Sequence, residues 1–416
     1  MYTYHLDIFS DSSLITIHSF RQQMVQCSIS ADDISHAIIS KYNSLSNKGK
    51  PVTKSNGVKE WTVLAGIVGL IQDETGDKSS ISESSDSLDL IALSTGVKSL
   101  PDAVVKTKSM GRLLHDCHAE ILTLRAFNRF IISECQKVDG GIESSSYIEK
   151  DDTTNRYKFK LKKGIRFSLY VSQLPCGDCS LSQVQGNTSE EPWGSKEERN
   201  GNDIQLPNGI LRGREFYNIK GKVRTKPGRR DSPLTLSKSC CDKLSITQIK
   251  GLLSNVLSQF VNPDGFHLAH LVVPETEYSD ITELTNSFHK RLSNTDSFKP
   301  FEILYTKNQS PVDKTDESQT PANLSLVYIP SVSVHESITN SVKEGYFNKK
   351  TYVRKGGESC LSRVKLFEEA SRFVEITSEL TYLDVKASNK NYLALKESAF
   401  TALGGWCKTA TDDFEI

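Results

Sequence analysis

The segment FSLYVSQLPCGDC, residues 167–179, leads from an apolar run directly into two cysteines. Its first half is short, apolar and rich in aromatic and β-branched residues, which predicts a buried strand. Pro175 ends that strand and places Cys176 at the start of the next element. A second segment, DCHAE at residues 116–120, opens a pattern that predicts a helix over residues 116–132. The order of the chain is therefore a helix bearing His and Glu, then a strand ending in cysteine.

Together the two segments read H-x-E…P-C-x-x-C, the pattern of zinc-dependent nucleobase deaminases. Either half alone has an ordinary explanation, such as a chance H-x-E or a pair of buried thiols, but both in this order favour a metal site. His118 and Cys176 are the predicted ligands, and Glu120 lies where it can move protons without binding the metal. One His and two thiolates leave a fourth tetrahedral position for water. Spacing alone leaves the third ligand open between Cys179 and Cys240.

The 416 residues carry 51 Lys and Arg against 51 Asp and Glu, a net charge of zero that hides unlike parts. Residues 72–90 are acidic and Ser-rich, with a net charge of −5, whereas residues 211–250 carry +8. A basic stretch can be an ordinary solvated loop, but beside a nucleobase site it favours contact with RNA phosphates. No run of about 18 apolar residues exists, so we expect no membrane span.

Predicted strands alternate with predicted helices, which indicates an α/β class. The Ser30 segment has a capping sequence and begins an amphipathic helix, whereas residues 60–71 are apolar enough for a buried strand or helix. Further helices are predicted at 245–260 and 281–292, strands at 90–94, 266–273 and 324–329, and a mostly helical remainder. We expect an N-terminal extension over 1–34 and one domain over 35–416, with polar insertions near 72–90, 136–155 and 183–210.

Seven short stretches resemble the A-to-I editing deaminases, most closely their tRNA-specific branch. They are KYNSLSNKGKP with EWTVLA (41–51 and 60–65), STGVK (94–98), DCHAE (116–120), PCGD (175–178), and RTKPGR with SCCDK (224–229 and 239–243). The resemblance runs from about residue 35 to the C-terminus. It implies a cytidine-deaminase-like three-layer α/β/α core with a largely helical C-terminal extension.

The resemblance also implies an activity and a ligand set. The third zinc ligand would be Cys240, because this family has another residue type where Cys179 stands. The reaction would be hydrolytic deamination of adenosine to inosine in tRNA, at position 37, immediately 3′ of the anticodon of alanine tRNA. Alternatives are an editor of other structured RNAs, and a catalytically dead zinc-stabilised RNA-binding module, against which the presence of Glu120 argues. The predicted RNA contacts are Lys98, Arg224, Lys226 and Arg229.

The family further buries inositol hexakisphosphate beneath its active site. From periodicity alone the C-terminal cations would be a solvated helix face, but the resemblance favours the polyanion. Leu124 and Ile246 stand where relatives have basic residues. The matching positions are Arg125, Lys243, Lys365, Tyr382, Lys386, Tyr392, Lys396, Trp406 and Lys408.

The start of the sequence shows no basic segment followed by an apolar one, so we expect no secretory leader. Nine cysteines in such a chain are expected as thiols or metal ligands rather than disulfides. We expect a location in the cytoplasm, the nucleus or both. No obligate protein partner is predicted, and within these residues no segment resembles a double-stranded-RNA-binding module.

Overall fold

The computed structural model describes residues 29–72, 86–141, 144–153, 155–183, 211–226, 232–276, 280–315, 318–376 and 380–416. Most of the expected N-terminal extension, the acidic loop and the 183–210 insertion lie outside these ranges, as does the predicted RNA contact Arg229. Among the described residues, no helix combines the length and apolar character that crossing a lipid bilayer requires.

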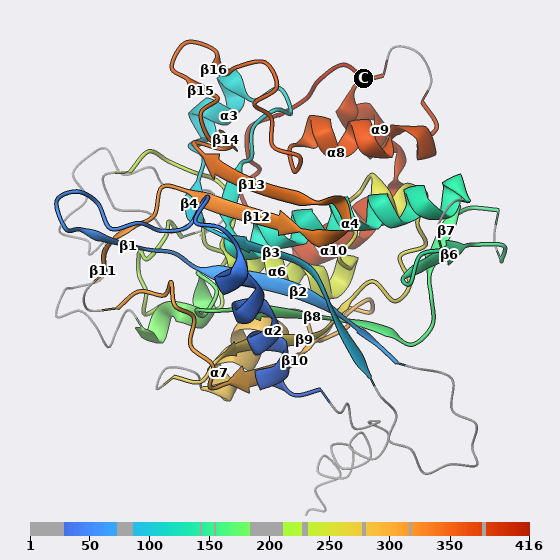
Figure 1. The fold of residues 1–416 in the computed structure, drawn as a ribbon. Helices are drawn as coiled ribbons and strands as arrows, with labels where there is room; N and C mark the ends of the chain where they lie inside the picture. Colours follow the sequence, from blue (N-terminus) through green and yellow to red (C-terminus); the bar gives the residue numbers. More distant parts are fainter. Residues whose placement is uncertain are drawn as a thin grey trace, which may run out of the picture.

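A central sheet of eight strands organises the fold (Figure 1). The first three strands at one edge are parallel to one another, and every other neighbouring pair is antiparallel. In spatial order the strands are β10 (Glu302–Thr306), β9 (Leu268–Pro274), β8 (Ile165–Val171), β2 (Leu64–Ile71), β3 (Ser87–Thr95), β12 (Ser325–Ile329), β13 (Val334–Thr339) and β14 (Val342–Lys343).

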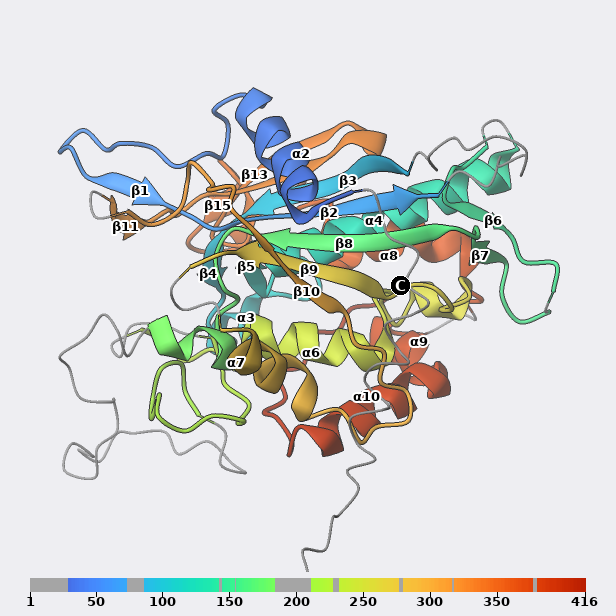
Figure 2. The same cartoon turned by 90° about the horizontal axis from the view of Figure 1, so that it is seen from below.

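Helices cover both faces of this sheet. The helices are α2 (Ala31–Ser44), α3 (Asp102–Lys108), α4 (Ala119–Gly140), α6 (Cys240–Lys250), α7 (Ile281–Thr285), α8 (Arg363–Ala370), α9 (Tyr382–Ser388) and α10 (Lys390–Ala402). Figure 2 shows α2 on one side of the sheet, with α4 and α6 on the other. This layering confirms the predicted α/β/α class.

Within the described ranges, four two-stranded ladders lie outside the central sheet. They pair β1 (Lys59–Trp61) with β11 (Ser318–Pro321), β4 (Val97–Ser99) with β5 (Asp116–His118), β6 (Ile148–Lys150) with β7 (Phe159–Leu161), and β15 (Phe347–Asn348) with β16 (Tyr352–Val353). The β4–β5 ladder matters most for function, because it delivers His118 to the start of α4.

Strand β2 is buried on both faces, which explains why its sequence could be read as strand or helix. Ala65 and Ile67 belong to the core that α4 covers, whereas Val68 packs in the core beneath α2. Helix α2 approaches so closely that a Cβ at Gly66 would lie 2.7 Å from the Ile38 side chain. The predicted start of α2 is confirmed, because Ser30 Oγ accepts from the backbone of Asp33 at 3.1 Å.

Three sequence-based predictions were wrong in extent. Residues 116–118 form a strand rather than helix, because the backbone of His118 is extended and its N–H bonds Asp116 Oδ1 at 3.1 Å. The helix expected over 245–260 is α6, which ends at Lys250 because Gly251 adopts a φ of +74°. The region after Ile329, expected to be mostly helical, first forms the strands β13 to β16.

Two secondary-structure elements cross the bounds expected for the extension and for one insertion. Helix α2 begins at Ala31, before the expected domain start at residue 35, and it forms part of the core. The expected polar insertion at 136–155 contains the end of α4 and the strand β6.

Candidate active site

Three side chains from three separate elements converge at one end of the sheet. His118 ends β5, Cys176 follows β8, and Cys240 opens α6, and their donor atoms all lie within 4.8 Å of one another. His118 Nδ1 is 3.8 Å from Cys176 Sγ and 3.6 Å from Cys240 Sγ. One imidazole and two thiols suit Zn²⁺ and leave a fourth position open. Cys179 is not in this cluster, and its thiol donates to the carbonyl of Pro175 at 2.8 Å.

The two cysteine segments meet through the first turn of α6. The backbone N–H of Cys240 points at Cys176 Sγ, 3.3 Å away, and the N–H of Cys241 donates to the Cys176 carbonyl at 3.0 Å. A helix N-terminus favours negative charge, so this arrangement suits a thiolate. Gly177 makes the close approach possible, because a Cβ there would lie 2.4 Å from Ser239 Oγ.

Glu120 lies in the first turn of α4 and is only 3% exposed. Its Oε2 has no hydrogen-bond partner among the described residues. Burial raises the pKa of this carboxyl, partly offset by the nearby charges of Lys226 and His118. A carboxyl with a raised pKa and a free oxygen beside a metal site is suited to accept and return a proton.

Lys226 is buried against the same thiols. Its Nζ lies 2.6 Å from Cys240 Sγ, 3.5 Å from Cys176 Sγ and 3.4 Å from Asp116 Oδ2. Burial alone would raise the pKa of the Cys176 thiol, but the Cys240 side chain and the Lys226 charge lower it well below its ordinary value. Lys226, a predicted RNA contact, is only 2% exposed, and its ammonium lies among the thiols of the candidate metal site.

Residues 92–409 match the adenosine-deaminase (editase) domain. The chain belongs to the adenosine-deaminase (editase) family. It is 33% identical over 395 residues to the tRNA-specific adenosine deaminase 1 of Saccharomyces cerevisiae, covering 92% of this chain and 94% of that protein. The Schizosaccharomyces pombe protein of the same name is 29% identical, and the alignment covers 92% of this chain and 96% of that protein. The Drosophila melanogaster double-stranded RNA-specific editase Adar is 24% identical, covering 79% of this chain and 48% of that protein.

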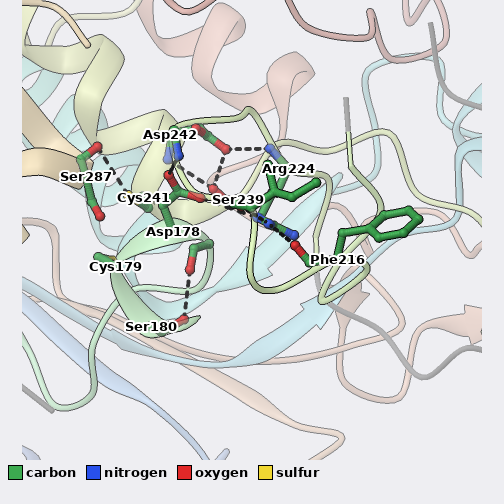
Figure 3. Close-up of polar contacts among 12 residues, drawn as sticks. Asp178, Cys179, Ser180, Phe216, Arg224, Ser239, Cys241, Asp242 and Ser287 are labelled. Atoms are coloured by element: carbon green, nitrogen blue, oxygen red, sulfur yellow. Dashed lines mark hydrogen bonds and ion pairs between the residues drawn. The ribbon is translucent and has the colours of Figure 1, made fainter. Parts of the chain in front are cut away.

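The editase is accordingly an enzyme that hydrolyses adenosine to inosine, as its sequence resemblance predicted. Arg224 departs from its predicted role in contacting RNA. Its side chain is fully buried, and its guanidinium bonds backbone carbonyls and Asp178. Figure 3 shows it directed into the protein between Phe216 and Asp178. A guanidinium so occupied cannot reach a phosphate in solution.

Next to the metal cluster, the editase contains a cation-lined cavity of about 200 Å³. Asp116 lies between the cluster and the cavity. Its Oδ2 pairs with the ammonium of Lys226 on the side of the cluster and with the ammonium of Lys243 on the side of the cavity. Arg125 and Arg363 line the same cavity. The cavity is therefore positive, and Asp116 alone separates it from the candidate metal cluster.

A further lysine predicted to hold a polyanion, Lys386, lies close to the cavity cations Arg363 and Arg125, and Lys238 lines the cavity itself. Lys386 Nζ lies 5.2 Å from the ring centre of Tyr382, and the unpredicted Lys238 Nζ lies 4.4 Å from that of Trp406. Burial and the charges of Arg363 and its neighbours lower the pKa of Lys386 to about 8. Burial with neighbouring lysines lowers the pKa of Lys238 to about 7. The editase therefore pays an electrostatic cost for this cluster unless an anion occupies it.

Other predicted members of the cluster have mixed outcomes. Burial and other cations, Lys250 foremost, lower the pKa of Lys396, and Lys250 itself lies 5.5 Å over the ring of Tyr392. Lys408 is exposed. Lys365 is not placed in the cavity, because its ammonium bonds Glu368 at 2.6 Å on the outer face of α8.

Sequence reasoning did not assign Arg363, Lys238 or Lys250 to the polyanion site. Leu124 and Ile246, which replace basic residues of relatives, pack instead against apolar cores of the editase. Lys98 sits on β4 opposite Cys117 in the ladder that delivers His118. Helical phase shows that Arg363 and Lys365 face different ways, but it does not show which of them faces the cavity.

Proposed function

We propose that this editase deaminates adenosine in tRNA, at position 37, immediately 3′ of the anticodon of alanine tRNA. Two observations support the proposal. The metal-binding cluster lies beside a buried carboxyl with a free oxygen, and two relatives named as tRNA-specific deaminases align with 92% of the chain. An anticodon loop also presents its bases with less stacking to break than a duplex, so the target base reaches a buried site at lower cost.

The residues of the chain fit a zinc ion held by His118, Cys176 and Cys240. When bound, Zn²⁺ would supply Lewis-acid activation and make a water molecule acidic near neutral pH. Glu120 takes a proton from the attacking water and passes it to the ring nitrogen of adenine next to C6, the carbon that the water attacks. The water oxygen bonds C6, and Glu120 then moves the second water proton to the amino group, which leaves as ammonia. Lys226 balances the negative charge of the thiolates during these transfers.

We further propose that the cation-lined cavity binds inositol hexakisphosphate. The ligand chemistry fits, because Asp116 pairs with Lys243 and Asp412 with Arg363, while burial and neighbouring cations still lower the pKa values of Lys386 and Lys396, a cost that phosphates would relieve. Arg125, Lys243, Arg363, Lys386 and Lys396 are the residues we assign to this contact. Arg363 takes the place that the sequence assigned to Lys365.

The RNA-contacting surface is assigned to the exposed part of the basic stretch. Of its cations, Arg224 and Lys226 are buried, whereas Arg214 and Lys222 are exposed. Lys220 pairs with Glu283 of α7. Among the described residues of this stretch, the exposed cations therefore lie in the loop at 211–222, and we assign that loop to the phosphates.

Inosine mapping on total tRNA incubated with the purified protein tests the proposal. We expect inosine at position 37 of alanine tRNA, and inosine confined to other RNAs would favour the alternative editor. Glu120→Ala should keep zinc and RNA binding while abolishing inosine formation and ammonia release. Glu302→Ala, which removes an exposed carboxylate from β10, is the matched control and should retain activity. Full activity in Glu120→Ala would refute the proton-transfer role.

A further inference from the structure

Arg224 uses every donor of its guanidinium inside the protein. An arginine side chain carries five N–H donors. Here Nη1 donates to the carbonyls of Gly213 at 3.2 Å and Glu215 at 2.7 Å, and Nη2 to those of Phe216 at 3.1 Å and Ile219 at 2.5 Å. The fifth donor, Nε, lies 3.3 Å from the carboxylate of an aspartate. One side chain therefore fixes the loop from residue 213 to 219.

The aspartate that receives Nε is Asp178, two residues after the metal-binding Cys176. Asp242 stands in the same relation to Cys240 and accepts the backbone N–H of Arg224 at 2.9 Å. Both carboxylates are at least 95% buried. Arg224 thus contacts the two cysteine segments through equivalent positions, with its side chain on one and its backbone on the other (Figure 3).

Arg291 completes the arrangement from the helical segment that follows α7. Its Nη1 donates to Asp242 Oδ1 at 2.9 Å, and its Nη2 to the carbonyl of Ser287 at 3.0 Å. Two arginines therefore balance two aspartates in a buried, neutral group of four. Buried charges hold their positions tightly because an unpaired one is costly. The distance between the two cysteine segments is set by this group as well as by the backbone.

We propose that Arg224 is a positioning residue for the metal site, which ties the loop 213–219 and the Cys176 and Cys240 segments into one rigid unit. The proposal rests on the proposed function, since it takes those cysteines as metal ligands. Arg224 touches neither the metal donors nor the exposed surface. It acts through Asp178 and Asp242, and its effect on the reaction is the fixed separation of the two thiolates.

The test compares Arg224→Lys with wild type in the full chain, after exchange of the bound metal for Co²⁺. A lysine keeps the charge but has three donors in place of a planar fork, so it cannot hold four carbonyls and Asp178 together. We expect altered Co²⁺ absorption bands from the thiolate ligands and a loss of metal to a chelator that is about tenfold faster, as for outer partners of metal ligands. Arg112→Lys is the control, because Arg112 makes a comparable paired contact with Glu358 outside the site.

A spectrum and chelator rate equal to wild type in folded Arg224→Lys would overturn the proposal, even if its melting temperature fell. If Arg224→Lys does not fold, Arg291→Lys replaces it, because Arg291 braces Asp242 without holding the loop. That variant must shift the Co²⁺ bands in the same sense, and an unchanged spectrum would count against the proposal. Failure of the wild-type chain to bind Co²⁺ at all would instead refute the metal site of the proposed function.

Discussion

Replacing Gly177 by alanine should disrupt the metal site by separating the two cysteine segments. Gly177 has a φ of +115°, and an added Cβ would lie 2.4 Å from Ser239 Oγ, 2.7 Å from Ser239 Cβ and 3.0 Å from Cys241 Cβ. Ser239 cannot retreat freely, because its Oγ caps α6 by accepting from the backbone of Asp242 at 3.0 Å. Backbone strain costs about 1–3 kcal/mol, because a φ of +115° with a ψ of −153° lies in a region that essentially only glycine adopts, and the overlap costs about 1–3 kcal/mol. We expect Gly177→Ala to lose about 2–6 kcal/mol of the free energy of unfolding.

The assay is urea denaturation together with the zinc content of the purified protein. Gly345→Ala is the matched control, because Gly345 also has a positive φ, +84°, but a Cβ there would meet nothing within 4 Å. The control should show the backbone strain alone and retain its zinc, whereas Gly177→Ala should lose zinc as well. Equal losses of stability in the two variants, with zinc retained in both, would refute the reasoning from close contact.

Three other predictions concern the metal site, the cation-lined cavity and a buried carboxyl. Cys240→Ala should lose zinc while Cys179→Ala retains it, as measured by metal analysis, and the reverse result would overturn the ligand assignment. Lys386→Met should stabilise the chain without inositol hexakisphosphate by up to about 3 kcal/mol at pH 7, because the pKa of Lys386 falls from 10.5 to about 8. With the polyanion bound, the same change should lower the melting temperature, and a stabilisation in both states would contradict the assignment of the cavity. Burial raises the pKa of the Asp313 carboxyl from 3.8 to about 7. The folded state therefore binds the carboxyl proton more tightly than the unfolded state does, and the free energy of unfolding falls as pH rises from about 4 to about 7. Asp313→Asn should therefore raise the free energy of unfolding at pH 8 by about 2 kcal/mol and change it little at pH 4, which denaturation at the two pH values would check.

Local signals in the sequence were sufficient where one short segment determines the structure. The Ser30 capping sequence placed the start of α2, and the paired motifs identified His118, Cys176 and Glu120 as neighbours. Strand β2 was ambiguous because both of its faces are covered, which removes the polar alternation that distinguishes a strand from a helix. The sequence also did not reveal β13 to β16, because these strands are only two to six residues long and are held by hairpin pairing with the strand next to them in sequence, so they show little periodicity.

The direction of a charged side chain was the least predictable property. Arg214 and Arg224 belong to the same basic stretch, yet Arg214 is exposed and Arg224 is fully buried. The difference comes from Asp178, which is distant in sequence and supplies the buried partner. Arg363 and Lys365 show the same limit within one helix. Only the placement of α8 against α4 determines which of the two cations faces the cavity.

The three donors of the metal site are far apart along the chain, and this has a consequence for synthesis. His118 and Cys176 are separated by 58 residues, and Cys176 and Cys240 by 64. At roughly 5–20 residues per second, a ribosome needs about 3–13 seconds to supply the last donor after the second. The nascent chain therefore carries an incomplete thiol–imidazole pair for seconds before the site can close. Metal retention in the finished protein then reports that β5, the turn after β8 and the first turn of α6 have all reached their places.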